Sequence, residues 1–419
     1  MRIPFSRKIL TNRMHVLVHE DHTTPLAACT VVYRAGSRDE DPDCTGLAHL
    51  CEHLMFTGSR NAPDFDLELQ KAGAINNAYT SQDLTNYYIV LPAKNIETAL
   101  WLEADRLSSL TLSQNSLDVQ KHVVVEEFKE TCLNVPYGDL LLQLNDLSYR
   151  KHPYRWLPIG KMPEHIEKTD RDTVLGFFKR FYCPANAILV VAGNVDTGEI
   201  FDMAAKWFED IPAGAKNPHS YPIETPGTEN RFREVRKNVP NDMLYKSWLM
   251  CGRTDPGYFA FDLLSDIIGT GKSSYLYKKF VLEKRLFTDI SASVSGTHHK
   301  GLFLVGGRPA DGVSLEQADE EISKYLSVEI FGKTLDYDLQ KVQNNGESII
   351  LERNLKVEDR ANNLASSEFY NCAEDASLET DNYFNVSAND IVNAAETLFK
   401  ETCCNTLFYR AESKDTASE

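Results

Sequence analysis

The sequence predicts an α/β (α+β) protein made of two similar domains. Its 419 residues are more than one ordinary hydrophobic core encloses, which indicates two or three domains of about 150–200 residues. Stretches rich in β-branched residues alternate with amphipathic helical stretches along the whole chain. A proline-containing segment, residues 211–228, divides the chain, and the same order of elements begins again after it.

The first half is predicted to contain strands and helices in alternation. The strand 187–193 is entirely apolar, as expected of a strand with both faces covered. Gly73 ends the helix that begins at Asp64, because glycine readily adopts the left-handed conformation of a helix terminus. Strands are expected at 14–18, 26–33 and 187–193, and residues 78–91 are expected to form strand structure around a polar turn. Helices are expected at 45–56, 64–72, 96–110, 116–132 and 200–208, and a further helix is expected to end with residues 177–182.

The second half repeats this order. Strand-like residues 232–239 and 244–250 precede a glycine-containing loop at 251–257, and a helix follows at 259–268. We therefore expect an N-terminal domain at 1–214, a linker at 215–228 and a homologous C-terminal domain at 229–419. The second copy of the helix carries Asp and Ser where metal ligands would be, so only the first domain is expected to bind a metal ion.

The composition excludes several classes of protein. Apolar residues make up 42% of the chain and charged residues 25%, as in globular proteins. The formal net charge of −17 argues against nucleic acid as a partner, because phosphate would be repelled, although basic peptides would be tolerated. No run approaches about 18 apolar residues, so no membrane-spanning helix and no membrane partner are expected.

The cysteines and the first residues predict the compartment. Nine cysteines, an odd number without paired spacing, fit reduced thiols better than a disulfide framework. The first eight residues contain no apolar core long enough for a signal peptide. We therefore expect a cytoplasmic, bacterial-type protein, or a periplasmic one if a leader has been removed.

Residues 45–56 are predicted to form a helix with a metal-binding face. At about 100° per residue the leucines fall on one side and would be buried. His49 and His53 lie one turn apart on another side, with Glu52 on their flank. Two neutral imidazoles at this spacing can bind one cation, and the carboxylate can accept a proton from a water on it. The order His-x-x-Glu-His is the inverse of the commoner zincin motif; an amphipathic helix with two incidental histidines is the alternative.

A third ligand is expected from the helix at 116–132. Catalytic zinc usually takes three protein ligands and leaves the fourth position for water. On a helical wheel Glu127 shares a face with Gln120 and two valines, whereas Glu126 points about 100° away. A carboxylate on an apolar face is costly unless a partner or a cation neutralises it. Glu127 is therefore the predicted third ligand, and a solvated acidic cluster describes Glu126 and Glu130.

These residues resemble a known family. His49-Leu50-Cys51-Glu52-His53, followed after 73 residues by Glu127 within Val-Val-Val-Glu-Glu, is similar to the inverzincin zinc metallopeptidases of the pitrilysin/insulinase family. That family includes mitochondrial processing peptidase and the core subunits of cytochrome bc1. Further matches are Gly36-Ser37-Arg38-Asp39-Glu40, Asn77-Ala78-Tyr79-Thr80-Ser81, Thr85-Asn86-Tyr87-Tyr88, His152-Pro153-Tyr154, Ile159-Gly160 and Val191-Ala192-Gly193-Asn194-Val195-Asp196.

The resemblance implies a fold and a mechanism. A single-length subunit of this family has two homologous domains, each a mostly antiparallel sheet covered by helices, and forms half of a clam-shell that encloses a peptide. His49, His53 and Glu127 would hold one Zn²⁺ per chain, and Glu52 would activate the water. A strand would bind the peptide substrate in an extended conformation by edge addition. Its residues here are Asn77, Ala78, Tyr79 and Thr80.

Two departures from the family pattern affect this hypothesis. Gln120 stands where the family has a carboxylate that supports the zinc site. Active members also have, in the second domain, an Arg and a Tyr seven residues apart that reach toward the developing oxyanion. Here Leu282 and Asp289 occupy those positions.

The resulting hypothesis is a zinc-dependent endopeptidase or oligopeptidase subunit. The zinc ligands are present and the Arg/Tyr pair is absent, which indicates the catalytic half of a heterodimer with a homologous, Arg/Tyr-bearing partner. A self-sufficient homodimeric peptidase and a non-catalytic scaffold subunit like the respiratory core proteins are the alternatives.

Overall fold

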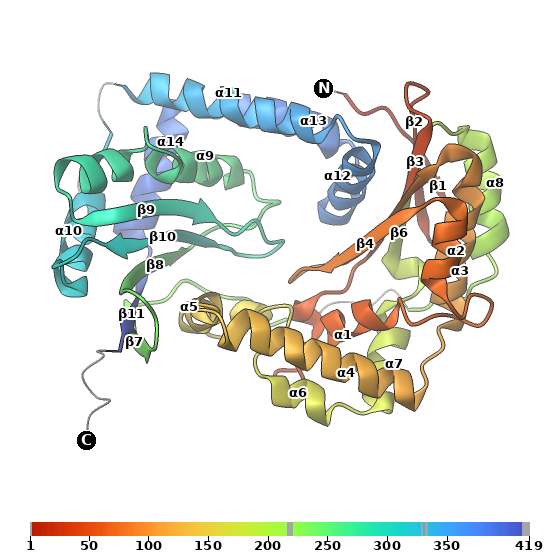
Figure 1. The fold of residues 1–419 in the computed structure, drawn as a ribbon. Coiled ribbons are helices and arrows are strands. Elements are labelled where there is room, and N and C mark those ends of the chain that lie inside the picture. Colours follow the sequence, from red (N-terminus) through yellow and green to blue (C-terminus); the bar gives the residue numbers. More distant parts are fainter. Residues whose placement is uncertain (1, 216–220, 328–329, 332–333, 413–419) are drawn as a thin grey trace. The chain divides into compact units, whose positions relative to one another are not determined.

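The computed structural model describes residues 2–215, 221–327, 330–331 and 334–412. They form two compact units, each built around one β-sheet (Figure 1). Unit 1 consists of the described residues within 1–130, 156–221 and 349–379, and unit 2 of those within 131–155, 222–348 and 380–419. The predicted fold class is thereby confirmed. Part of the predicted linker 215–228, residues 216–220, lies outside the described residues.

The sheet of unit 1 has six strands in the order β1-β2-β6-β3-β5-β4. Neighbouring strands are antiparallel except for the parallel pair β2 and β6. The most apolar strand, β6, lies within the sheet, and all seven of its residues are buried, as its composition predicts. The strands are β1 (Ser6–Ile9), β2 (His15–Glu20), β3 (Leu26–Tyr33), β4 (Ile75–Thr80), β5 (Thr85–Pro92) and β6 (Ala187–Gly193).

Helices cover both faces of this sheet. Successive strand residues point to opposite faces, so Val31 packs in one apolar cluster and Val32 in another. The first cluster includes residues of α1, α3, α7 and α8, and the second is closed by α12. The helices are α1 (Leu47–Leu54), α2 (Phe65–Ala72), α3 (Ile96–Ser109), α4 (Gln114–Phe128), α6 (Pro163–Lys168), α7 (Arg171–Phe181), α8 (Thr197–Phe208) and α12 (Val357–Tyr370).

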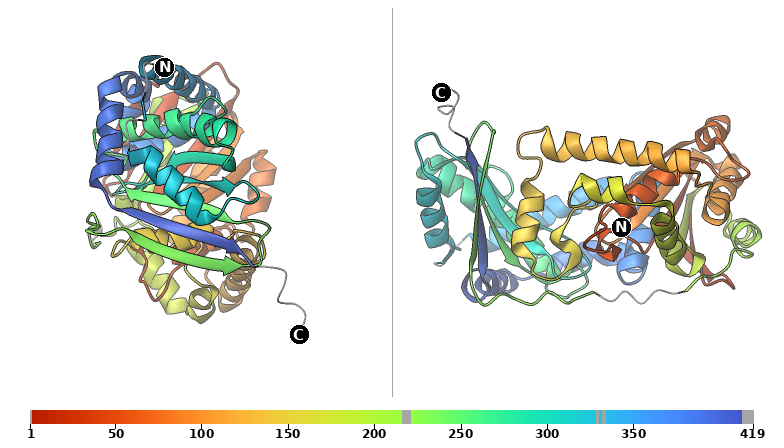
Figure 2. Two further views of the ribbon diagram at one scale, coloured as in Figure 1. Left: turned by 90° about the vertical axis from the view of Figure 1, so that its left-hand side faces the viewer. Right: turned by 90° about the horizontal axis from the view of Figure 1, so that it is seen from below.

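Unit 2 has a five-stranded sheet in the order β7-β11-β8-β10-β9, with β7 and β11 parallel and the other pairs antiparallel. Residues of α9, α10 and α14 pack on one face, and α5 packs on the other through Leu140, Leu144 and Leu147 (Figure 2). The elements are β7 (Arg231–Lys237), β8 (Met243–Leu249), β9 (Phe287–Val294), β10 (Leu302–Pro309), β11 (Cys404–Ala411), α5 (Leu140–Ser148), α9 (Tyr258–Gly269), α10 (Leu315–Ser327) and α14 (Ala388–Glu396). Two helices, α11 (Leu335–Arg353) and α13 (Asp375–Phe384), have residues in both units.

The two sheets share one topology. Apart from β1, which adds to β2 in unit 1, the strands correspond: β2 and β7 are parallel to the last strand of their unit, β6 or β11, and that strand pairs antiparallel with β3 or β8. Two further antiparallel strands follow in each sheet. The helix α9 follows β8 as α1 follows β3. Each unit also contains a helix from the other half of the sequence. Residues 131–155, which include α5, belong to unit 2, and residues 349–379, which include α12, belong to unit 1.

The described residues give two further findings. None of their helices combines the length and the apolar composition that crossing a bilayer requires. All nine cysteines are free thiols.

Candidate metal centre

Helix α1 presents its two faces as the sequence predicts. Leu47, Leu50 and Leu54 are buried in the core of unit 1, at most 4% exposed. The histidine face is only partly covered: the side chain of His49 is 12% exposed and that of His53 is 23% exposed. The imidazoles therefore remain reachable while the leucines anchor the helix.

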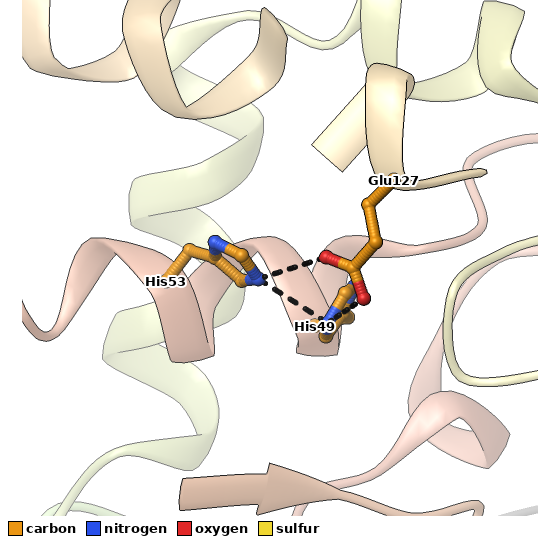
Figure 3. A group of neighbouring side chains, drawn as sticks. All are labelled: His49, His53 and Glu127. Atoms are coloured by element: carbon orange, nitrogen blue, oxygen red, sulfur yellow. Dashed lines mark hydrogen bonds and ion pairs between the residues drawn. The ribbon is translucent and has the colours of Figure 1, made fainter. Parts of the chain in front are cut away.

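His49, His53 and Glu127 converge (Figure 3). Helix α4 packs against α1 and brings Glu127 over the two rings. The Nε2 atoms of the histidines are 3.3 Å apart, and the Glu127 carboxylate oxygens lie 3.7 Å from His49 Nε2 and 3.4 Å from His53 Nε2. Among the described residues, these three form the one group of His, Cys, Asp and Glu side chains arranged to hold a metal ion, with ligand atoms within 4.8 Å of one another.

The electrostatics of the three groups are coupled. Burial, together with the charge of the neighbouring His53, lowers the pKa of His49 to about 4, although Glu127 opposes the decrease. Burial also disfavours protonated His53, but the hydrogen bond and charge of Glu127 outweigh burial and raise the pKa of His53. The same hydrogen bond lowers the pKa of Glu127. Because a metal ligand must be deprotonated, a cation would replace the proton that His53 and Glu127 share.

The surroundings of Glu127 differ in one respect from the prediction. Val124 is buried, but Val123 is 42% exposed and the Glu127 side chain is 39% exposed. Glu127 therefore lies at the edge of the buried face of α4 and not within it. Gln120, one of the departures from the family pattern, forms a side-chain hydrogen bond with His53 that raises the pKa of that imidazole.

Glu52 is held by the edge strand. The Thr80 hydroxyl on β4 donates a hydrogen bond of 2.5 Å to Glu52 Oε2. Burial raises the pKa of Glu52, and the Thr80 bond opposes that rise. The sequence predicted Thr80 only as a contact for substrate; its bond to Glu52 depends on packing between β4 and α1 that no local pattern shows.

Strand β4 is the end of its sheet. It pairs with β5 on one side, and no described strand pairs with its other side. The predicted substrate-binding residues Asn77, Ala78, Tyr79 and Thr80 lie on this strand, with Asn77 and Tyr79 exposed and the other two partly buried. The backbone N–H of Ala78 donates to the side chain of Asn77 at 2.9 Å.

Unit 2 contains the other positions named from the sequence. Leu282 is 57% exposed and lies in a helical stretch, Tyr277–Glu283. Asp289 is an exposed residue of β9. On α9, Asp262 accepts a hydrogen bond from the Tyr383 hydroxyl at 2.5 Å.

Two family models match this chain side by side. The model described as insulinase (peptidase family M16) matches residues 15–153, which include all three converging side chains. The model described as the M16 peptidase inactive domain matches residues 168–352, which fits the lack of metal ligands on α9.

Proteins of the same kind resemble the chain over its whole length. The zinc protease PqqE of Helicobacter pylori is 29% identical over 96% of this chain and 91% of its own. The crystal structure of a protease from H. pylori superposes with a TM-score of 0.89 at 26% identity, covering 98% of this chain and all of that one. The periplasmic protease PqqL of Escherichia coli shares the fold at 16% identity and a TM-score of 0.79; the match covers 97% of this chain but 48% of PqqL.

Proposed function

Because this chain belongs to the insulinase (M16) family of peptidases, we propose that it hydrolyses peptides with one zinc ion bound by His49, His53 and Glu127. It is a zinc metallopeptidase, as its relatives are named. The observation that carries the proposal is the convergence of these three side chains from two helices that are far apart in the sequence.

The donor set suits zinc. Two imidazoles and one carboxylate are the ligands of many catalytic zinc sites, and they leave a fourth position for water. Ligand atoms about 2.0–2.2 Å from a tetrahedral ion lie roughly 3.3–3.6 Å from one another. The separation of 3.3 Å between the two Nε2 atoms and that of 3.4 Å between His53 Nε2 and Glu127 Oε2 match that spacing, and Glu127 Oε1 lies slightly farther out, 3.7 Å from His49 Nε2.

Each side chain then has a defined role. When bound, a zinc ion in such a site supplies a water of lowered pKa and polarises the scissile carbonyl. Glu52 accepts the proton of the attacking water and delivers it to the leaving amine. The Thr80 hydroxyl holds the Glu52 carboxylate toward the reacting atoms. Gln120, through its hydrogen bond, fixes the ring of His53.

The edge of the sheet supplies the substrate site. An extended peptide can add to the free side of β4 through backbone hydrogen bonds, which read conformation more than sequence. The N–H of Ala78 donates to the side chain of its neighbour Asn77, and the carbonyl of a bound peptide would replace that acceptor. Substrates are therefore unstructured peptides, with residues 77–80 as their backbone contact.

The partner follows from the missing Arg/Tyr pair. With Leu282 and Asp289 at those positions, this chain lacks the donors that the family directs to the oxyanion. A homologous partner chain carrying Arg and Tyr would complete the enzyme, and the match to about half of PqqL fits a chain that is one half of a larger assembly. We expect little hydrolysis of unstructured peptides by the lone chain and a large rise on adding such a partner. Robust activity of the lone chain would favour a homodimeric peptidase; no activity from any combination would favour a scaffold.

Zinc binding is tested by removing one ligand. The wild-type chain should bind about one equivalent of zinc, and His49→Ala should bind none at micromolar zinc, because only two protein ligands, both partly exposed, remain. Elemental analysis after gel filtration measures this directly. His22→Ala is the control. The side chain of His22 is 65% exposed and lies in the turn between β2 and β3, and it is not one of the three converging residues. Equal zinc content in wild type and His49→Ala would refute the assignment.

A further inference from the structure

We propose that Glu40 is a positioning residue for the metal centre: its buried carboxylate caps the start of α1 and thereby fixes His49. The proposal rests on the metal site proposed above. Glu40 follows a short helical turn, Ser37–Asp39, and is 6% exposed. It lies outside α1 in the sequence.

The carboxylate of Glu40 binds the first turn of α1 directly. Its Oε2 accepts the backbone N–H of Gly46 at 2.9 Å, and its Oε1 accepts that of Ala48 at 2.9 Å. Trp156 Nε1 also donates to Oε2, at 3.1 Å. His49 is the next residue after Ala48, so the hydrogen-bonded turn is the one that carries the first ligand.

This helix has no cap of its own. Its N-cap residue, Gly46, has no side chain and adopts a left-handed conformation, with φ of 89°. A Cβ at Gly46 would meet the Ile166 side chain at 2.9 Å and the Ile159 carbonyl oxygen at 3.0 Å, so the usual Ser, Thr, Asp or Asn cap is excluded by space and by backbone conformation. Without Glu40, buried N–H groups at the helix start would lack acceptors, which destabilises this turn of α1.

Two opposing effects act on the charge of Glu40. Burial raises the pKa of Glu40 to about 8, although the three N–H donors oppose that rise because they stabilise the ionised form. Both oxygens accept hydrogen bonds, so neither is directed to act as a hydroxyl donor. A carboxylate at this point also lies at the positive end of the helix dipole.

Glu40→Gln is the most informative substitution. The amide keeps the size of the side chain but replaces one accepting oxygen by a donor, so the N–H of Ala48 or that of Gly46 must face another N–H. We expect the dissociation constant of zinc, measured by competition with a chromophoric chelator, to rise about 10–100-fold, as for other residues that support metal ligands. With Co²⁺ as the probe, the visible absorption of the four-coordinate ion should weaken and shift, because His49 moves.

Glu224→Gln is the matched control. Glu224 is 4% exposed and its Oε2 accepts two backbone N–H groups, those of Lys151 and His152, at 2.8 and 2.9 Å within unit 2. Its substitution should leave the zinc affinity and the Co²⁺ spectrum as in the wild type. If Glu40→Gln does not fold, Glu40→Asp is measured in its place. Aspartate keeps the carboxylate but is one methylene too short to reach both N–H groups.

The outcomes separate the two proposals. If the wild type binds zinc and both folded Glu40 variants bind it equally well with unchanged Co²⁺ spectra, the role of Glu40 is refuted and the metal site stands. If the wild type binds no zinc, the proposed function fails and the role of Glu40 fails with it. Weakened binding in the Glu40 variants with an unaffected Glu224→Gln supports both.

Discussion

Replacing Glu52 by Gln should lower kcat for peptide hydrolysis by about 10²–10⁴-fold, the usual contribution of general acid–base catalysis. The amide cannot accept the proton of the attacking water. Its oxygen can still accept the hydrogen bond from the Thr80 hydroxyl, so the local structure should persist. The zinc content should stay at one equivalent per chain, because Glu52 is not among the converging ligands. Steady-state kinetics of the complete enzyme, with elemental analysis of the same samples, measures both.

Glu126→Gln is the control for this experiment. Glu126 lies beside Glu127 on α4, but its side chain is 48% exposed and pairs with Lys129. Its substitution should change kcat less than twofold. A Glu52→Gln enzyme with near wild-type kcat would show that another group transfers the proton.

Replacing Arg106 by Met should reduce the free energy of unfolding by about 3–5 kcal/mol, because it leaves Glu103 as an uncompensated buried charge. Both residues of this pair on α3 are at most 1% exposed. The Arg106 guanidinium donates to Glu103 through Nε at 2.9 Å and Nη2 at 2.5 Å, and it lies over the rings of Phe56, Phe65 and Tyr87. Phe56 follows α1, so this pair supports the core beneath the metal-binding helix.

The double variant Glu103→Leu with Arg106→Met should recover most of that loss, because replacing a whole buried ion pair by apolar residues is often neutral or stabilising. Urea unfolding monitored by circular dichroism measures the difference. Lys71→Met provides the comparison: Lys71 forms an ion pair with Glu68 at the same spacing on α2, but its side chain is 59% exposed, so the expected loss is below about 1 kcal/mol. Equal losses for Arg106→Met and Lys71→Met would contradict this account of the core.

The residues of the centre could be predicted from the sequence because their signals are local. His49, Glu52 and His53 lie within five residues, and the helical period alone puts both imidazoles on one face. Glu127 could be chosen over Glu126 because the two side chains point about 100° apart on α4, and in the structure Glu127 reaches the histidines while Glu126 pairs with Lys129. Cys51, within the same motif, packs in the core.

The remaining features depend on contacts that have no local signal. Glu103 and Arg106 have the i, i+3 spacing of ordinary surface ion pairs, and only the packing of α3 against the sheet buries them. Glu40 acts on a helix that begins several residues later, through a loop conformation that the sequence does not specify. The linear order also cannot show that α5 covers the sheet of unit 2 or that α12 covers that of unit 1.

The most direct test of the zinc assignment is anomalous X-ray scattering at the zinc absorption edge, from crystals of the chain grown with zinc. We expect one peak in unit 1, about 2.0–2.2 Å from His49 Nε2, His53 Nε2 and a carboxylate oxygen of Glu127. A peak at other residues, or one at the two histidines with Glu127 directed elsewhere, would contradict the account.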